Sequence, residues 1–234
     1  MKIALLGYGR MGKAIEAIAL ERGHQIVYRL DKDLEEGRLA DAEVAINFSV
    51  PQAAVLNIKA AFEAGVPVVC GTTGWLDQRA EIETLCETQK TAFLYASNFS
   101  VGVNLFFKLT RFLAQLMAPH SSNYHASLTE THHVHKLDAP SGTAITLAEN
   151  IIQNSDYQKW TMETPQEAQL PISSIREGEV PGTHSITYTS EIDAIKITHE
   201  AFNRKGFALG AVLAAEWLTG KTGIYAMDDV LNLS

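Results

Sequence analysis

Short apolar runs and segments with helical spacing alternate through the first hundred residues. The apolar runs cover residues 3–6, 25–30, 42–48, 66–70 and 91–95, and continuous runs of this kind are typical of strands buried on both faces of a sheet. Between them, the segments 13–22, 52–64 and 76–89 carry apolar residues at helical spacing. This alternation predicts an α/β fold with a doubly wound, parallel, Rossmann-like sheet. The short polar segment 34–41 predicts a loop or one helical turn.

The pattern changes after residue 100. Helices are predicted over residues 101–117 and 143–153, and strands over 124–130, 172–176, 184–189 and 193–199, whereas the polar stretch 158–170 predicts no element. This order predicts a second, α+β domain with an open mixed sheet. Because one helix leaves a face or edge of such a sheet uncovered, we expect burial in an oligomer. A final helix over 207–218 should return to the first domain.

The predicted division gives each domain a separate task. Residues 1–100 plus 205–234 form a dinucleotide-binding domain, and residues 101–204 form a substrate-binding and oligomerisation domain. Ligands bind outside the carboxyl ends of the strands in sheets of the first kind. We therefore expect the cofactor site at the segments that follow the first, fourth and fifth strands.

The segment after the first strand is a G-x-G-x-x-G motif. Its glycines permit a tight turn, a close approach to a pyrophosphate and close helix packing, and the helix start offers N–H groups to the phosphates. Asp31 follows the second strand, where an acid can bond ribose hydroxyls. The alternative is a merely tight strand–helix turn. The predicted cofactor-binding residues are Gly7, Tyr8, Gly9, Arg10, Met11, Gly12, Asp31, Lys32, Gly71, Thr72, Thr73, Ala96, Ser97, Asn98 and Phe99.

Two cations near this motif bear on the choice of cofactor. Asp31 alone would repel the 2′-phosphate of NADPH, whereas Lys32 beside it and Arg10 in the glycine loop could offset that repulsion. We therefore hypothesise that both NADH and NADPH are used. The alternative is that Lys32 is an ordinary solvated lysine.

Residues 132–136 place three histidines and a lysine close to a helix start at residues 141–143. A histidine suits proton transfer near neutral pH, and a lysine suits a substrate carboxylate. The helix start offers hydroxyls and N–H groups to an anion, although Ser141 could also be only an N-cap. This combination predicts a small acidic substrate. We predict no metal site because no ligand motif with zinc spacing surrounds the histidines. His24, His120 and His184 are interpreted as surface or packing residues.

Composition narrows the class of protein. A net charge of −8 disfavours binding to nucleic acid or to an anionic membrane, and no window approaches the length of a membrane span. Two separate cysteines suit a reducing compartment without disulfides. We expect a soluble, cytoplasmic protein.

The segment 130–143 resembles a family signature. Its sequence ETHHVHKLDAPSGT is similar to the E-x-H-H-x-x-K-x-D-x-P-S-G-T motif of the 4-hydroxy-tetrahydrodipicolinate reductase (dihydrodipicolinate reductase) family. Further similarities at residues 7–12, 71–74, 98–104 and 223–231 extend the resemblance over essentially the whole chain. Val134 departs from the family, in which a basic residue is common at that position.

The resemblance implies roles for individual residues. His132 would be the proton donor, assisted by Lys136, while hydride from NADH or NADPH reduces the ring as hydroxide leaves. It implies a homotetramer in the lysine and diaminopimelate route, and a looser match places Arg204 near the substrate. The residues implied to hold the two substrate carboxylates are His133, Lys136, Ser141, Gly142 and Thr143.

Two other functions stay open from the residues. One is another two-domain NAD(P)-dependent reductase or dehydrogenase that acts on an aspartate-derived amino acid. The other is a regulatory protein that binds NAD(P) without turnover, although a sensor needs no proton donor.

Overall fold

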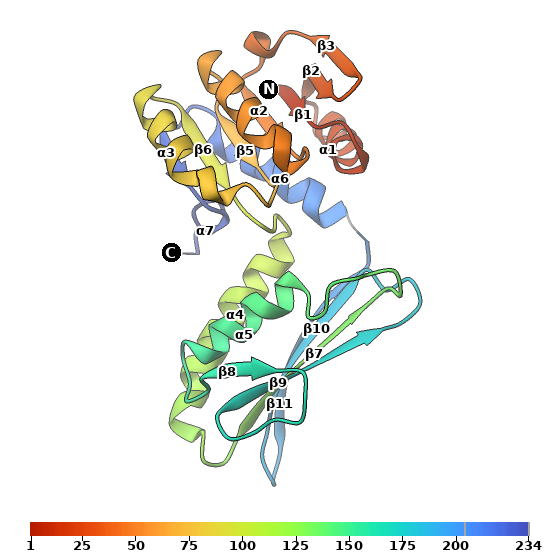
Figure 1. Ribbon diagram of the computed structural model, residues 1–234, viewed down its shortest axis with the longest axis vertical. Coiled ribbons are helices and arrows are strands. Elements are labelled where there is room, and N and C mark those ends of the chain that lie inside the picture. Colours follow the sequence, from red (N-terminus) through yellow and green to blue (C-terminus); the bar gives the residue numbers. More distant parts are fainter. Residues whose placement is uncertain (204, 234) are drawn as a thin grey trace. The chain divides into compact units, whose positions relative to one another are not determined.

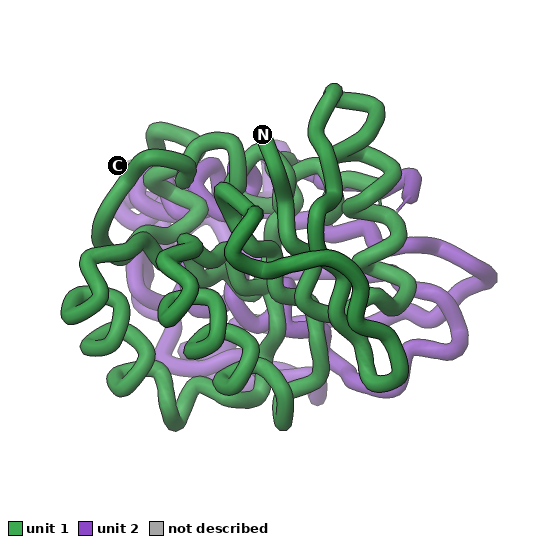
Figure 2. Tube along the Cα trace, turned by 90° about the horizontal axis from the view of Figure 1, so that it is seen from above, with its two compact units in different colours: residues 1–104, 205–234 green, residues 105–204 purple. Residues whose placement is uncertain are grey.

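The computed structural model describes residues 1–203 and 205–233. The chain divides into two compact units, one formed by residues 1–104 and 205–234 and the other by residues 105–204 (Figure 2). The division lies inside helix α4 (Val101–Met117), four residues beyond the boundary expected from the sequence. Each unit has its own sheet and its own buried core.

Unit 1 contains a seven-stranded sheet of order β12-β6-β5-β4-β1-β2-β3. Its neighbouring strands are parallel except for the antiparallel pair β2–β3. The sheet is therefore the predicted doubly wound α/β sheet with two further edge strands, the antiparallel β3 and the parallel β12. The strands are β1 (Lys2–Leu6), β2 (Gln25–Asp31), β3 (Leu34–Gly37), β4 (Val44–Asn47), β5 (Val68–Cys70), β6 (Ala92–Tyr95) and β12 (Gly223–Tyr225).

Helices cover both faces of this sheet (Figure 1). Successive side chains of a strand point to opposite faces, so Ile3 and Leu5 pack with α1 and α6, whereas Ala4 and Leu6 pack with α2 and α3. Burial on both faces explains why the central strands are continuous apolar runs. The helices are α1 (Arg10–Glu21), α2 (Pro51–Glu63), α3 (Arg79–Thr88), α6 (Lys205–Leu218) and α7 (Met227–Val230), with short 3₁₀ turns at Leu39–Asp41 and Leu76–Gln78.

The interpretation of residues 34–41 as a loop or one helical turn was wrong for its first half. Residues Leu34–Gly37 form the edge strand β3, in which Gly37 pairs with Tyr28. A side chain at Gly37 would place its Cβ 1.9 Å from the Val27 carbonyl oxygen. The strand is made by backbone pairing and by this close approach, so its polar sequence has no hydrophobic alternation to reveal it.

Unit 2 contains a five-stranded sheet of order β11-β10-β7-β9-β8. β9 is parallel to β7 and β8, whereas β10 is antiparallel to β7 and β11, so the sheet is mixed as predicted. Strand β8 lies in the polar stretch for which no element was predicted. The elements are β7 (His125–His132), α5 (Gly142–Ile152), β8 (Lys159–Thr161), β9 (Gln169–Arg176), β10 (Gly182–Thr189) and β11 (Ala194–Ala201), with a 3₁₀ turn at Ala118–His120.

Helices α4 and α5 lie against one face of the second sheet (Figure 1). Along β7, Ala126 and Leu128 point into the core beneath them, and Glu130 and His132 continue the same buried row. Two polar side chains therefore end a strand face that is otherwise apolar. None of the described helices has the length and apolar character that crossing a membrane requires.

Candidate active site

Glu130 is a completely buried carboxylate at the centre of three strands of unit 2. It lies opposite Ser174 on β9 and His184 on β10. Ser174 Oγ donates to Oε1 at 2.8 Å, and the Ser141 N–H donates to both oxygens at 3.1 and 3.2 Å. Burial by itself raises the pKa of Glu130, but hydrogen bonds from His184, Ser141 and Ser174 outweigh it and hold that pKa well below its usual range. The carboxylate is therefore ionised and fixed.

His132 ends β7 two residues after Glu130, on the same face, and only 7% of it is exposed. Its Nδ1 lies 3.3 Å from Glu130 Oε2, and its ring lies edge-on to that of His184 with centroids 5.0 Å apart. Burial lowers the pKa of His132 to about 4; Glu130 opposes this, whereas His184, Lys136 and Arg176 add to it. With this pKa, the ring of His132 is neutral near pH 7 when no ligand is bound.

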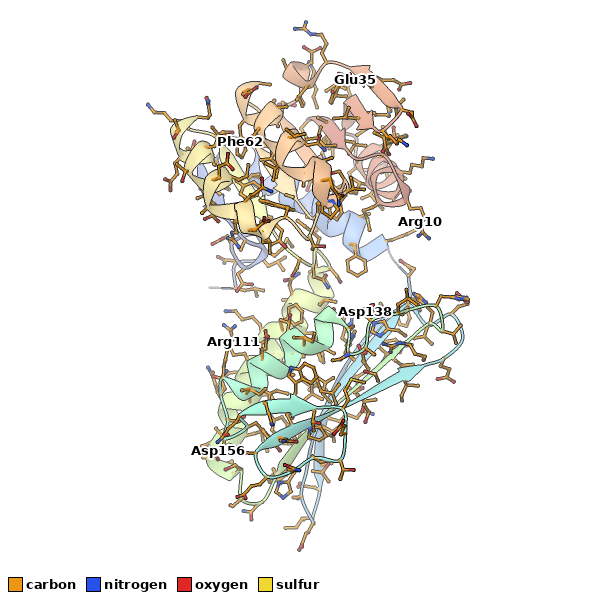
Figure 3. The ribbon with its side chains drawn as sticks, viewed as in Figure 1. Arg10, Glu35, Phe62, Arg111, Asp138 and Asp156 are labelled. Carbon is orange, nitrogen blue, oxygen red and sulfur yellow. The ribbon has the colours of Figure 1, made fainter. Side chains whose placement is uncertain are left out.

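Lys136 lies in the 133–141 loop, which connects β7 to α5. Its Nζ donates to both carboxylate oxygens of Asp138 at 2.8 Å, and this ion pair lowers the pKa of Asp138. Figure 3 labels Asp138 on this loop. Arg176 of β9 donates to the backbone oxygens of Lys136 and Asp138 and to Glu130 Oε1. One arginine thus ties the loop to the sheet.

Ser141 is the N-cap of α5, as one interpretation of the sequence predicted. Its Oγ accepts from the Ala144 N–H at 3.2 Å and lies 3.2 Å from His184 Nε2. Gly142 and Thr143 form the first turn, where helix geometry leaves N–H groups for an anion. The cap and an anion site are compatible, because they use different groups of the same turn.

The structure separates the three neighbouring histidines. His132 is buried, His133 is half-buried, and His135 is exposed with Nε2 3.5 Å from Glu179. Only His132 belongs to the buried cluster around Glu130. His135 therefore has the surroundings of an ordinary surface side chain.

The glycine motif of unit 1 borders a pocket of about 510 Å³. Gly7, Gly9, Asp31 and Lys32 line it, together with residues at the end of β4 and on α2. Asp31 Oδ2 accepts from the Tyr8 N–H at 2.9 Å, so the acid at the end of β2 also holds the glycine loop. A Cβ at Gly7 would lie 2.3 Å from the Phe48 carbonyl oxygen, which explains why this position requires glycine. The pocket lies beside the glycine loop that follows β1, where sheets of this kind bind nucleotides.

The segments after β5 and β6 contain side chains with structural contacts. Thr72 Oγ1 accepts from the Ser49 N–H at 2.9 Å, and Trp75 Nε1 donates to the Thr72 carbonyl at 2.7 Å. Asn98 Oδ1 accepts from the Ser100 N–H at 2.9 Å, and Phe99 is buried. Thr73 and Ser97 are exposed at these strand ends. The contacts shape the two segments and leave Thr73 and Ser97 accessible to a ligand.

Two family models together match nearly the whole chain. "Dihydrodipicolinate reductase, N-terminus" matches residues 1–99, and "Dihydrodipicolinate reductase, C-terminus" matches residues 102–231. The chain belongs to the dihydrodipicolinate reductase family. It is therefore an oxidoreductase with a nucleotide-binding N-terminal domain.

Two relatives match the chain over nearly its full length. The 4-hydroxy-tetrahydrodipicolinate reductase of Christiangramia forsetii is 54% identical over 235 residues, covering 99% of this chain and 98% of the relative. That of Archaeoglobus fulgidus is 36% identical over 263 residues, covering 99% and 100%. A solved structure, dipicolinate-bound dihydrodipicolinate reductase from Paenisporosarcina sp. TG-14, has a TM-score of 0.78 at 22% identity and covers 100% of this chain and 99% of that one. The last similarity concerns the fold.

Membership of the dihydrodipicolinate reductase family does not explain every residue of the buried cluster. Ser174, Arg176 and His184 join Glu130 and His132, and the sequence had not singled them out for the site. For His184, the interpretation as a surface or packing residue missed its contact with the N-cap of α5. The one signal in the sequence was a polar residue at an inward position of strands β9 and β10. Arg204, the looser match, lies outside the described residues.

Glu130, His132 and His184 have ligand atoms within 4.8 Å of one another, close enough to consider a cation. However, Glu130 already accepts from Ser174, from the Ser141 amide and from the Arg176 guanidinium. The arginine supplies the positive charge that a metal would otherwise provide. We therefore interpret the cluster as a hydrogen-bonded network.

Proposed function

We propose that this protein reduces 4-hydroxy-tetrahydrodipicolinate to tetrahydrodipicolinate, with His132 as the proton donor. The observation that carries the proposal is the juxtaposition, in a chain of this family, of a buried histidine, a lysine and an open helix start around one loop. A bound nicotinamide supplies the hydride. A proton and the departing hydroxide leave as water, which balances the reaction.

The substrate carboxylates are assigned to groups of the 133–141 loop and the start of α5. Lys136 provides a fixed cation, and the first turn of α5 provides N–H groups and the Thr143 hydroxyl. His133 completes this set. In forming its pair with Lys136, a substrate carboxylate takes over the role that Asp138 has in this structure.

His132 gains its proton when the substrate binds. Burial keeps the ring neutral by itself, and two substrate carboxylates nearby favour the imidazolium. Because the bound dianion raises the pKa of His132, the ring is protonated when the substrate is present. Lys136 assists by holding the dianion, although its own charge disfavours the imidazolium.

The cofactor is assigned to unit 1, and we propose that both NADH and NADPH serve. The glycine loop, from Gly7 to Gly12, holds the pyrophosphate with Arg10 and Met11 at the start of α1. Asp31 and Lys32 both line this pocket, and we assign them to the ribose of the adenosine. The groups assigned to the nicotinamide half are Gly71, Thr72, Thr73, Ala96, Ser97, Asn98 and Phe99.

We further propose that unit 2 carries the contacts of a homotetramer. Four large apolar side chains are about half exposed on one stripe of α4, namely Leu105, Leu109, Phe112 and Leu116. A cytoplasmic location stays a prediction from the cysteine pattern; both cysteines are free and buried.

An assay of turnover tests the function directly. The substrate is generated in the cuvette from pyruvate and aspartate semialdehyde by a synthase, and the absorbance of NADH or NADPH is followed. We expect oxidation of both cofactors that requires this protein. Absence of oxidation by folded protein would reject the proposed reaction. A preference for one cofactor above about a thousandfold, roughly 4 kcal/mol, would reject dual use.

A further inference from the structure

The two ring nitrogens of His132 have different surroundings. Nδ1 is buried, lies 3.3 Å from Glu130 Oε2 and has no hydrogen-bond partner among the described residues. Nε2 lies beside Gly182 of β10, where a Cβ would come within 3.1 Å of it. The missing side chain at Gly182 thus leaves room at the Nε2 edge of the ring. The two nitrogens are suited to different tasks.

Glu130 is held so that one of its oxygens is directed at the histidines. Ser174 Oγ and Arg176 Nη2 both donate to Oε1. Oε2 lies 3.3 Å from His132 Nδ1 and 3.6 Å from His184 Nε2, and receives the Ser141 amide as well. Because these donors come from β9 and from the start of α5, the carboxylate is fixed from two sides. The position of the carboxylate is therefore set by these donors and not by the ring of His132.

We propose that Glu130 is the positioning residue of the proton donor: its Oε2 holds the Nδ1 proton of His132, so that Nε2 is the nitrogen that delivers a proton to the substrate. The proposal rests on the proposed role of His132 and deepens it. In the step, the Nε2–H bond breaks, its electron pair stays on Nε2, and the proton passes to the substrate. The ring keeps its Nδ1 proton against Glu130, and solvent water returns the proton to Nε2. The present Nδ1–Oε2 approach lacks ideal alignment, as is common before a substrate is bound.

Charge gives Glu130 a second effect. The groups that face His132 are Glu130 on β7, Arg176 on β9, His184 on β10 and Lys136 in the 133–141 loop. Burial and the three basic groups lower the pKa of His132, and Glu130 raises it. Among these described groups, Glu130 is therefore the one that favours the imidazolium. Removing the charge of Glu130 should lower the pKa of His132 and should weaken the contact that orients its ring.

The substitution Glu130→Gln tests both effects, because it keeps the shape of the side chain and removes the charge. We expect kcat to fall about a hundredfold, with the KM for the substrate changed less than about threefold. We also expect the alkaline limb of the kcat–pH profile, where the donor loses its proton, to move to lower pH. Glu130→Asp keeps the charge and should return the limb toward its original position. A merely structural role would lower stability and cofactor binding and leave the limb in place.

Ser174→Ala is the matched control. It removes one hydrogen bond to Glu130 and leaves the carboxylate charge, so the alkaline limb should stay within a few tenths of a pH unit. An equal shift of the limb in Ser174→Ala and Glu130→Gln would mean that the hydrogen bond to β9, and not the charge of Glu130, determines the pKa of His132. The proposal would then be wrong.

Nitrogen NMR of the wild-type protein tests the tautomer even if the Glu130 variants fold poorly. The His132 resonances are assigned by their loss in His132→Gln. At pH 7 to 8 we expect a protonated Nδ1 and an unprotonated Nε2, and the opposite tautomer would overturn the proposal. The proposed function can fail separately from this inference. Full activity of His132→Gln would reject His132 as the proton donor. An inactive His132→Gln together with a fully active Glu130→Gln would reject only the role of Glu130.

Discussion

Burial and the charge of Glu130 act in opposite directions on the pKa of His132. Burial removes water that would solvate an imidazolium, while Glu130 lies 3.3 Å from Nδ1 and favours it. The balance leaves a neutral ring in the ligand-free protein, and we expect a bound anion to favour its protonation. A side chain with such a balance suits proton transfer better than the exposed His135 three positions later.

The substitution His132→Gln tests the donor. We expect kcat to fall about a hundredfold or more, because a general acid contributes on this scale, while the dissociation constant of NADH is unchanged. Steady-state kinetics and cofactor titration by fluorescence measure both quantities. His135→Gln, in the loop that follows His132, is the matched control and should keep its activity. Loss of NADH binding in His132→Gln would show that the residue has another role.

The depressed pKa of His132 also predicts a dependence of stability on pH. The unfolded histidine titrates near 6.5 and the folded one near 4, so the unfolded state binds more protons between these values. This contribution is fully present above pH 6.5 and is lost as the pH falls through the window. Between pH 6.5 and 5 we expect His132 to account for about 1.5 kcal/mol of lost unfolding free energy.

Urea titrations of the wild type and of His132→Gln over this range measure the difference. The wild type should lose stability more steeply, while His199, whose pKa burial also lowers, contributes equally to both proteins. Parallel slopes would contradict a buried neutral His132. The range stops above the region where carboxylates titrate.

At the scale of elements, helix α6 shows how one glycine sets the packing of a helix. A Cβ at Gly210 would lie 1.6 Å from the Phe99 carbonyl oxygen, so α6 lies directly against the segment after β6. Phe99 in turn packs against Phe48 at the end of β4, with ring centroids 5.4 Å apart. The helix therefore supports the segments assigned to the nicotinamide.

The pair Gly210→Ala and Gly206→Ala tests this packing within one helix. At Gly206 the nearest atom to a new Cβ is Ser100 Oγ at 3.5 Å, which is ordinary contact. Both changes gain helix propensity of up to about 1 kcal/mol, but Gly210→Ala must displace backbone. We expect Gly206→Ala to be neutral or stabilising and Gly210→Ala to lose about 3 kcal/mol. Thermal unfolding compares them, and equal melting temperatures would contradict the close packing.

At the scale of the whole molecule, the second sheet and α4 leave apolar surface to be covered. Sedimentation equilibrium should give a mass near four times the 25.6 kDa of the chain, if unit 2 carries tetramer contacts. Phe112→Asp on the exposed stripe of α4 should lower this mass, whereas Leu56→Asp on exposed α2 of unit 1 should not. A monomer at micromolar concentration would contradict the proposed assembly.

The sequence by itself determined the larger elements and the fold class. The central strands of unit 1 are buried on both faces, so their apolar runs were visible, and helix α4 has the bounds that its spacing predicted. The G-x-G-x-x-G motif and the 130–143 signature were visible because each is contiguous in the chain. Local periodicity and contiguous motifs need no information about distant partners.

Only the tertiary structure decided what depends on pairing between strands. Strand β3 forms because backbone groups of β2 lie beside it, and its polar residues carry no periodic signal. Likewise, His184 and Ser174 reach Glu130 because β10 and β9 flank β7 in register. Register places residues more than forty positions apart against one carboxylate. The sequence could name His132 as a candidate, and the sheet decided which groups surround it.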